Sequence, residues 1–114
     1  MTTILDLSIR DAEKRAVLEA SAVLKKSFSV EKVILFGSKA RGDDDEESDI
    51  DLLVLTPRPV SWDERKAINA ALYEIQIEYD VVISALLTTV ADWHDGTFSV
   101  LPIHQEITEQ GVPA

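Results

Sequence analysis

The chain has 114 residues, 46% of them hydrophobic and 28% charged, a composition typical of a folded globular domain. Eleven Lys and Arg stand against 21 Asp and Glu, and the formal net charge of −10 argues against direct nucleic-acid binding. There is no cysteine, which excludes disulfides and thiolate metal sites. We expect one domain over residues 1–114, in the cytoplasm, with no signal peptide and no membrane association.

The N-terminal part of the chain predicts a helix followed by a buried strand. Ser8 and Asp11 resemble a capping box, and apolar residues then recur at helical spacing, so we predict a helix over about residues 9–28. Residues 30–36 form a short β-rich apolar run that stops at Gly37. Such a run is typical of a strand buried on both faces.

The remaining elements continue the alternation of strand and helix. Residues 48–55 predict a second strand, and Ser61 with Glu64 forms a capping box for a second helix. That helix has apolar residues at i, i+3, i+4 and i+7, the pattern that packs one stripe onto a sheet. Residues 77–84 predict a third strand. The last expected elements are a turn of helix capped by Thr89 with Asp92 and a helix over residues 99–110 closed by Gly111.

Two carboxylates in the second predicted strand indicate a metal site. Asp49 and Asp51 are two residues apart, so their side chains project from the same face of the strand. Two carboxylates about 5 Å apart repel by roughly 3 kcal/mol at an effective dielectric near 20, which disfavours the pair unless a cation binds it. Hard oxygen ligands of this kind suit Mg²⁺.

A glycine and a serine follow the first predicted strand and indicate a phosphate site. Gly37 permits close approach to the backbone, and Ser38 can begin a helical turn whose exposed amides bind an anion. These residues meet Asp49 and Asp51 only if the first two strands are antiparallel. Asp80, near the start of the third strand, joins them only if the second and third strands are parallel, which a right-handed helical crossover permits. We therefore predict an α/β fold, a mixed sheet of three or more strands with helices packed on it.

These residues also resemble a known signature. The segments Gly37-Ser38-Lys39-Ala40-Arg41-Gly42 and Ser48-Asp49-Ile50-Asp51-Leu52 match G-S-x-A-R-G and S-D-x-D-L. This signature is that of the DNA polymerase beta-like nucleotidyltransferase superfamily, and the spacing is that of its minimal nucleotidyltransferase branch. The resemblance covers about residues 9–84 and implies the polymerase beta palm-like fold.

The resemblance implies a reaction and a set of site residues. A nucleoside monophosphate would pass from a nucleoside triphosphate to a hydroxyl group, and pyrophosphate would leave. Asp49 and Asp51 would bind two Mg²⁺ ions, and Asp80 would be the third carboxylate, placed to help deprotonate the acceptor. Gly37 and Ser38 would hold the triphosphate.

Other residues allow more than one interpretation. Arg41 either reaches the triphosphate or pairs with the acidic run 43–47, and Glu78 competes with Asp80 as the third carboxylate. The acidic run is either a solvated loop or a contact for a basic partner. Trp62 and Trp93 either close the core, which we expect, or stack on a nucleotide base, and we expect surface positions for His94 and His104.

The size of the chain bears on the acceptor. Larger members of the superfamily attach further domains that hold the acceptor, so we expect the acceptor here to be another chain. Minimal nucleotidyltransferases are typically paired with a HEPN-domain toxin and move AMP from ATP onto a toxin tyrosine. We therefore predict a Mg²⁺-dependent protein adenylyltransferase that acts as an antitoxin. Two alternatives stay open: an antitoxin that neutralises its partner by stoichiometric binding, and a nucleotidyltransferase for a small molecule.

Overall fold

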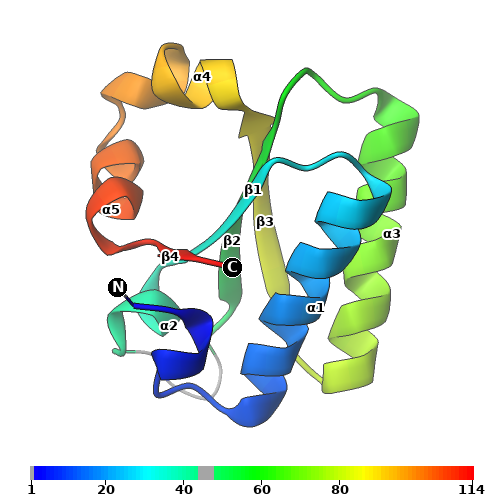
Figure 1. Cartoon of the computed structure of the whole chain (residues 1–114), viewed down its shortest axis with the longest axis vertical. Helices are drawn as coiled ribbons and strands as arrows, with labels where there is room; N and C mark the ends of the chain where they lie inside the picture. Colours follow the sequence, from blue (N-terminus) through cyan, green and yellow to red (C-terminus); the bar gives the residue numbers. More distant parts are fainter. Residues whose placement is uncertain (1, 44–47) are drawn as a thin grey trace.

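The computed structural model describes residues 2–43 and 48–114 and shows a four-stranded sheet between two layers of helices (Figure 1). In chain order the elements are η1 (Ile4–Asp6), α1 (Asp11–Ser27), β1 (Lys32–Phe36), α2 (Ser38–Arg41), β2 (Ile50–Thr56), α3 (Trp62–Tyr79), β3 (Ile83–Thr89), α4 (Val90–His94), η2 (Thr97–Val100), α5 (Pro102–Gln110) and β4 (Val112–Pro113). The strand order is β3-β2-β1-β4.

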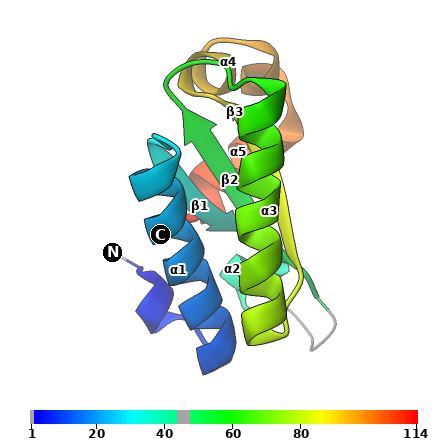
Figure 2. The same ribbon diagram turned by 90° about the vertical axis from the view of Figure 1, so that its right-hand side faces the viewer.

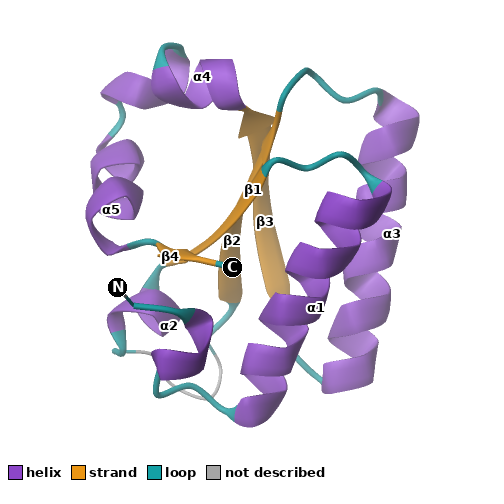
Figure 3. Ribbon diagram, in the orientation of Figure 1, coloured by secondary structure: helices purple, strands orange, loops and turns teal. Residues whose placement is uncertain are grey.

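The strand directions are those that the site requires. Strand β1 is antiparallel to β2 and β4, whereas β2 and β3 are parallel and are joined through α3. Figure 3 shows these strands in orange between the helices. The predicted mixed sheet is therefore confirmed, with β4 as an additional strand that was not predicted.

Each face of the sheet carries its own apolar core. Helices α1 and α3 lie side by side over one face (Figure 2), where Ile50 and Leu52 of β2 belong to the larger core. Leu53 and Leu55 of the same strand belong to the second core, with Trp93 of α4 and Ile107 of α5. Because side chains alternate along a strand, Asp51 projects toward the second face, away from α1 and α3.

Two of the three predicted helix caps are confirmed. Ser61 Oγ accepts a hydrogen bond from the Glu64 N–H at 3.0 Å, and Thr89 Oγ1 accepts one from the Asp92 N–H at 3.0 Å. For α1 the predicted cap is wrong. The N-cap residue is Arg10, and its N–H donates to Glu13 Oε1 at 3.0 Å.

The prediction of a strand over residues 77–84 is wrong in its boundaries. Helix α3 continues to Tyr79, where Asp80 ends it in the left-handed conformation with φ 53°. The Gln76 side chain then accepts a hydrogen bond from the Ile83 N–H at 3.1 Å, at the first residue of β3. The residues near position 80 that favour a strand therefore lie partly at the end of α3 and partly in the turn that connects α3 to β3.

The predicted helix over residues 99–110 consists of two elements, η2 and α5. Pro102 begins α5 at a position where a missing N–H costs nothing. Gly111 follows α5 but has extended backbone rather than the left-handed cap. Glycine is required there for space, because a Cβ would lie 2.5 Å from the Ile107 oxygen and 2.7 Å from an Ile34 methyl.

The predictions for the large aromatic side chains hold only in part. Trp93 is buried, as expected, but Trp62 is 72% exposed at the start of α3, about 120° around the helix from the buried Ile68. His94 is exposed as predicted, whereas His104 is half-buried and stacks on Trp93 with ring centroids 4.6 Å apart. None of the helices in the described ranges is long and apolar enough to cross a membrane.

Candidate functional site

The two halves of the sequence motif meet at one end of the β1–β2 pair. Phe36, the last residue of β1, is the ladder partner of Asp51, so Gly37 follows directly beside that carboxylate. Gly37 has φ +78°, and a Cβ at this position would overlap the Asp51 carboxylate. Ser38 then begins the short helix α2, as predicted. The structure therefore brings Gly37 and Ser38 together with the second motif aspartate.

Asp51 lies in an electrostatic environment that suits a cation. Burial raises the pKa of Asp51, and the charges of Asp49 and Glu106 raise it further, whereas Arg41 lowers it. Asp51 and the neighbouring Asp49 offer hard oxygen donors, and a divalent cation bound there would stabilise the ionised form of Asp51. Asp49 and Asp51 therefore fit Mg²⁺ by the chemistry of their donor atoms.

Arg41 is held by two acidic side chains next to Asp51. Its Nη1 donates to Glu106 Oε1 at 2.6 Å, and its Nε donates to Asp43 Oδ2 at 3.2 Å. Asp43 is the first residue of the acidic run, so the pairing expected for Arg41 is present; residues 44–47 lie outside the described residues. Glu106 comes from α5 and has no motif around it, so nothing in the sequence distinguishes it.

Lys39 occupies the variable position of the G-S-x-A-R-G motif and is a buried structural residue. Its side chain is 1% exposed and forms an ion pair with the buried Glu13 of α1. Burial by itself raises the pKa of Glu13, but hydrogen bonds from Lys39 and Arg10 outweigh it, and the pKa is lowered. The pair ties α2 to the first turn of α1. Glu13 lies three residues before the buried Ala16, on the apolar stripe of α1. A charged residue on such a stripe is the sequence signal that could have indicated a buried ion pair.

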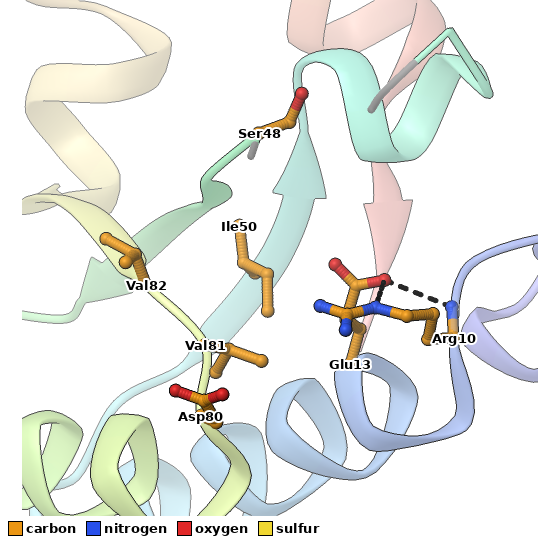
Figure 4. Close-up of a pocket in the computed structure, with 7 residues that line it drawn as sticks. All are labelled: Arg10, Glu13, Ser48, Ile50, Asp80, Val81 and Val82. Carbon is orange, nitrogen blue, oxygen red and sulfur yellow. Dashed lines mark hydrogen bonds and ion pairs between the residues drawn. The ribbon is translucent and has the colours of Figure 1, made fainter. Parts of the chain in front are cut away.

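Asp80 is placed apart from the Asp49–Asp51 pair. It lines a cavity of about 170 Å³ together with Arg10, Glu13, Ser48, Ile50, Val81 and Val82 (Figure 4). Ile50 and Asp51 are adjacent in β2 and project to opposite faces, so this cavity is on the α1 and α3 side. The expected convergence of three carboxylates is not present, because Asp80 caps α3 instead of beginning β3.

No residue in the described part of the chain replaces Asp80 as a third ligand. Within residues 2–43 and 48–114, no group of three or more His, Asp or Glu side chains is placed to hold a metal ion. The β3 residue beside Asp51 in the ladder is Ser84, and Glu78 is exposed on α3. The role of Asp80 as third carboxylate stays a prediction.

Comparison with known proteins identifies the family of the chain. The family model "Polymerase beta, Nucleotidyltransferase" matches residues 19–93, more than half of the chain. Two relatives from Methanocaldococcus jannaschii are provisionally named protein adenylyltransferases MJ0141 and MJ0604. The first is 39% identical over 69 residues, 60% of this chain and 68% of the relative. The second is 38% identical over 77 residues, 66% of this chain and 72% of the relative.

Solved structures agree with this assignment at the level of the fold. A provisionally named minimal nucleotidyltransferase superimposes with a TM-score of 0.60 at 23% identity, covering 94% of this chain and 99% of that one. A toxin–antitoxin structure with AMP-PNP gives a TM-score of 0.60 at 15% identity, covering 91% of this chain and 72% of that one. The matching motif, sheet topology and relatives place this chain in the polymerase beta-like nucleotidyltransferase family.

Proposed function

We propose that this chain transfers AMP from ATP to a hydroxyl group of a partner protein, with Mg²⁺ as cofactor, and acts as an antitoxin toward a HEPN-domain toxin. The observation that carries the proposal is the contact between Gly37 and Asp51, which joins both halves of the nucleotidyltransferase motif. The names of the M. jannaschii relatives support adenylyl transfer, and the toxin–antitoxin structures support a protein partner.

In the proposed reaction the acceptor oxygen forms a bond to the α-phosphorus of ATP. The bond from that phosphorus to the oxygen bridging to the β-phosphate breaks, pyrophosphate leaves, and the hydroxyl proton passes to a nearby base or to water. Asp49 and Asp51 would hold the metal, and bound Mg²⁺ supplies positive charge that offsets the negative charge of the triphosphate. No covalent enzyme intermediate is required.

The other motif residues position the nucleotide. Gly37 leaves the space beside Asp51 free of a side chain, so a phosphate can approach the backbone there. Ser38 adds a hydroxyl group at the start of α2. Arg41 lies close enough to Asp51 for its charge to lower the pKa of that carboxyl. In the nucleotide complex its guanidinium would release Glu106 and contact the triphosphate instead.

The test is intact-mass analysis of the protein that copurifies with this chain from its own host. We expect the partner to carry one or more AMP groups with wild type and none with Asp49→Asn/Asp51→Asn. The matched control is Asp11→Asn/Asp95→Asn, which removes two exposed carboxylates elsewhere and should leave the modification intact. A partner that is bound equally well but never modified would favour stoichiometric neutralisation and overturn the proposed transfer.

The same assay tests Asp80. Asn, like Asp, is tolerated in the left-handed conformation, so Asp80→Asn should keep the end of α3. If Asp80 is the third carboxylate, the rate of AMP transfer should fall by more than about 100-fold. Loss of a residue that only hydrogen-bonds to a metal ligand typically costs about 10–100-fold, and loss of the ligand itself costs more. Unchanged transfer would show that Asp80 only caps the helix.

A further inference from the structure

Helix α2 carries two cationic side chains, Lys39 and Arg41. Lys39 is buried and forms an ion pair with the buried Glu13, whereas the Arg41 side chain is 34% exposed. The helix begins directly after Gly37, which lies beside Asp51. Arg41 is therefore the α2 cation that a ligand at the candidate site can reach.

A carboxylate from a distant part of the chain holds the Arg41 guanidinium. Glu106 of α5 lies 65 positions later in the sequence, and its Oε1 accepts a hydrogen bond from Arg41 Nη1 at 2.6 Å. Carboxylate and phosphate oxygens both accept charge-assisted hydrogen bonds from a guanidinium group. Glu106 therefore makes the contact with Nη1 that a phosphate oxygen would make in the nucleotide complex.

The packing of α5 places Glu106 on the face of the sheet to which Asp51 projects. The next residue of α5, Ile107, is buried in the second core with Leu53 of β2. Leu53 and Asp51 are two residues apart in that strand, so their side chains share a face. The charge of Glu106 raises the pKa of Asp51, and the charge of Arg41 lowers it. Both members of the pair therefore belong to the candidate site.

The pair of Arg41 and Glu106 can open at little cost to the fold. The two side chains are 34% and 39% exposed, and ion pairs with such access to water contribute little to stability. The buried pair of Lys39 and Glu13 differs, because breaking it leaves a charge buried without its partner. A triphosphate offers several anionic oxygens where Glu106 offers one carboxylate, so it can displace Glu106 from Arg41.

We propose that Glu106 is a positioning residue that competes with the triphosphate for Arg41 and thereby weakens nucleotide binding. This role rests on the proposed function, because the competing ligand is the triphosphate of that reaction. In the free protein Glu106 holds the guanidinium beside Asp51. When the nucleotide binds, phosphate oxygens take over the hydrogen bond from Arg41 Nη1, and Glu106 is released to water. Glu106 acts through Arg41 and does not touch the reacting atoms.

The test is calorimetric titration of the full chain with ATP and Mg²⁺ in the absence of a partner. Glu106→Gln keeps an acceptor oxygen but removes the charge, and it should lower the Kd for ATP by about 5-fold, equivalent to about 1 kcal/mol. The matched control is Glu109→Gln, which makes the same charge change at an exposed position of the same helix and should leave the Kd unchanged. An unchanged or higher Kd in Glu106→Gln, or equal decreases in both variants, would overturn the proposal.

A double-mutant cycle tests whether Glu106 acts through Arg41. Arg41→Met removes the group for which Glu106 and the triphosphate compete, and it should raise the Kd for ATP. In that background Glu106→Gln should change the Kd by less than about 2-fold, because the shared partner is absent. A decrease as large as in the wild-type background would mean that Glu106 repels the nucleotide directly, and would overturn the competition for Arg41.

Transfer kinetics separate this role from a catalytic one. Glu106→Gln should lower the KM for ATP without raising kcat, because Arg41 contacts the triphosphate in the ground state and the transition state alike. A lower kcat at unchanged KM would assign Glu106 to the reacting groups and overturn the proposal. If the variant binds ATP more tightly but wild type never modifies its partner, the competition stands and the proposed function fails. A partner modified with the same KM by both proteins would mean the reverse.

Discussion

At the scale of single residues, the candidate site depends on the close approach of Gly37 and Asp51. Their contact requires a residue without a Cβ at the end of β1, and Gly37 also has a positive φ that other residues adopt only with strain. Gly42 has a similar backbone, with φ +84°, but a Cβ there would meet open space. A substitution at Gly42 therefore reports the cost of backbone strain alone, whereas the same substitution at Gly37 adds the steric overlap with Asp51.

We expect Gly37→Ala to lower the rate of AMP transfer by about 100-fold, the effect of displacing reacting groups by about 1 Å. Gly42→Ala should lose about 1 kcal/mol of stability through strain but keep its rate. Steady-state transfer assays and thermal unfolding of both variants check the comparison. Equal rates for the two variants would show that the contact with Asp51 is unimportant.

The buried pair of Lys39 and Glu13 makes a prediction about stability. Lys39→Met leaves the Glu13 carboxylate buried without its main partner and should cost about 3–5 kcal/mol in the free energy of unfolding. Lys39→Met/Glu13→Leu removes both charges and should recover most of that loss. Arg41→Met breaks a half-exposed pair and should cost less than about 1 kcal/mol. Urea unfolding measures the stability of all three variants. Lys39→Met with the stability of wild type would contradict the structural role of the buried ion pair.

The raised pKa of Asp51 predicts a pH effect. A carboxyl whose folded pKa lies above its ordinary value of 3.8 destabilises the fold as pH rises from that value through the raised one. Without metal, Asp51→Asn should therefore be more stable than wild type at pH 7. The difference should vanish below the ordinary pKa, where Asp51 is protonated in both states. Unfolding curves of wild type and variant across this range show whether the sign is right.

At the scale of elements, the capping residues decide where helices begin. Ser61→Ala removes the oxygen that accepts from the Glu64 N–H and should lower stability by about 1 kcal/mol. Ser61→Asp restores an acceptor and should retain stability. Thermal unfolding tests the pair of variants. An alanine variant with an unchanged melting temperature would mean that Glu64 finds water as an equal partner.

The boundary between α3 and β3 explains why Asp80 does not lie where the sequence predicts it. Local sequence favours a strand near residue 80, since Val81, Val82 and Ile83 are β-branched. Helix α3 nevertheless continues to Tyr79, because the buried stripe from Ile68 to Ile75 packs against the sheet and outweighs local propensity. The shift places Asp80 at a helix end, and this is why it does not reach the aspartate pair.

At the scale of the whole molecule, ligand binding should raise stability by linkage. A nucleotide with Mg²⁺ that binds only the folded chain adds about 2.7 kcal/mol at 100 times its Kd. We expect millimolar ATP with Mg²⁺ to raise the melting temperature by several degrees in wild type, and Asp51→Asn to abolish the rise. ATP with Mg²⁺ that leaves the wild-type melting curve unchanged would contradict the site.

The sequence by itself determined the family, the order of the main helices and of the first three strands, and the residues proposed for the core of the candidate site. Gly37, Ser38, Asp49 and Asp51 occupy short motifs whose chemistry and strand periodicity are local, so they can be recognised before folding. Only the tertiary structure decided the partners of Lys39 and Arg41, the position of Asp80 and the exposure of Trp62. Each of these depends on segments far apart in the chain, and burial or charge pairing between such segments leaves no local pattern.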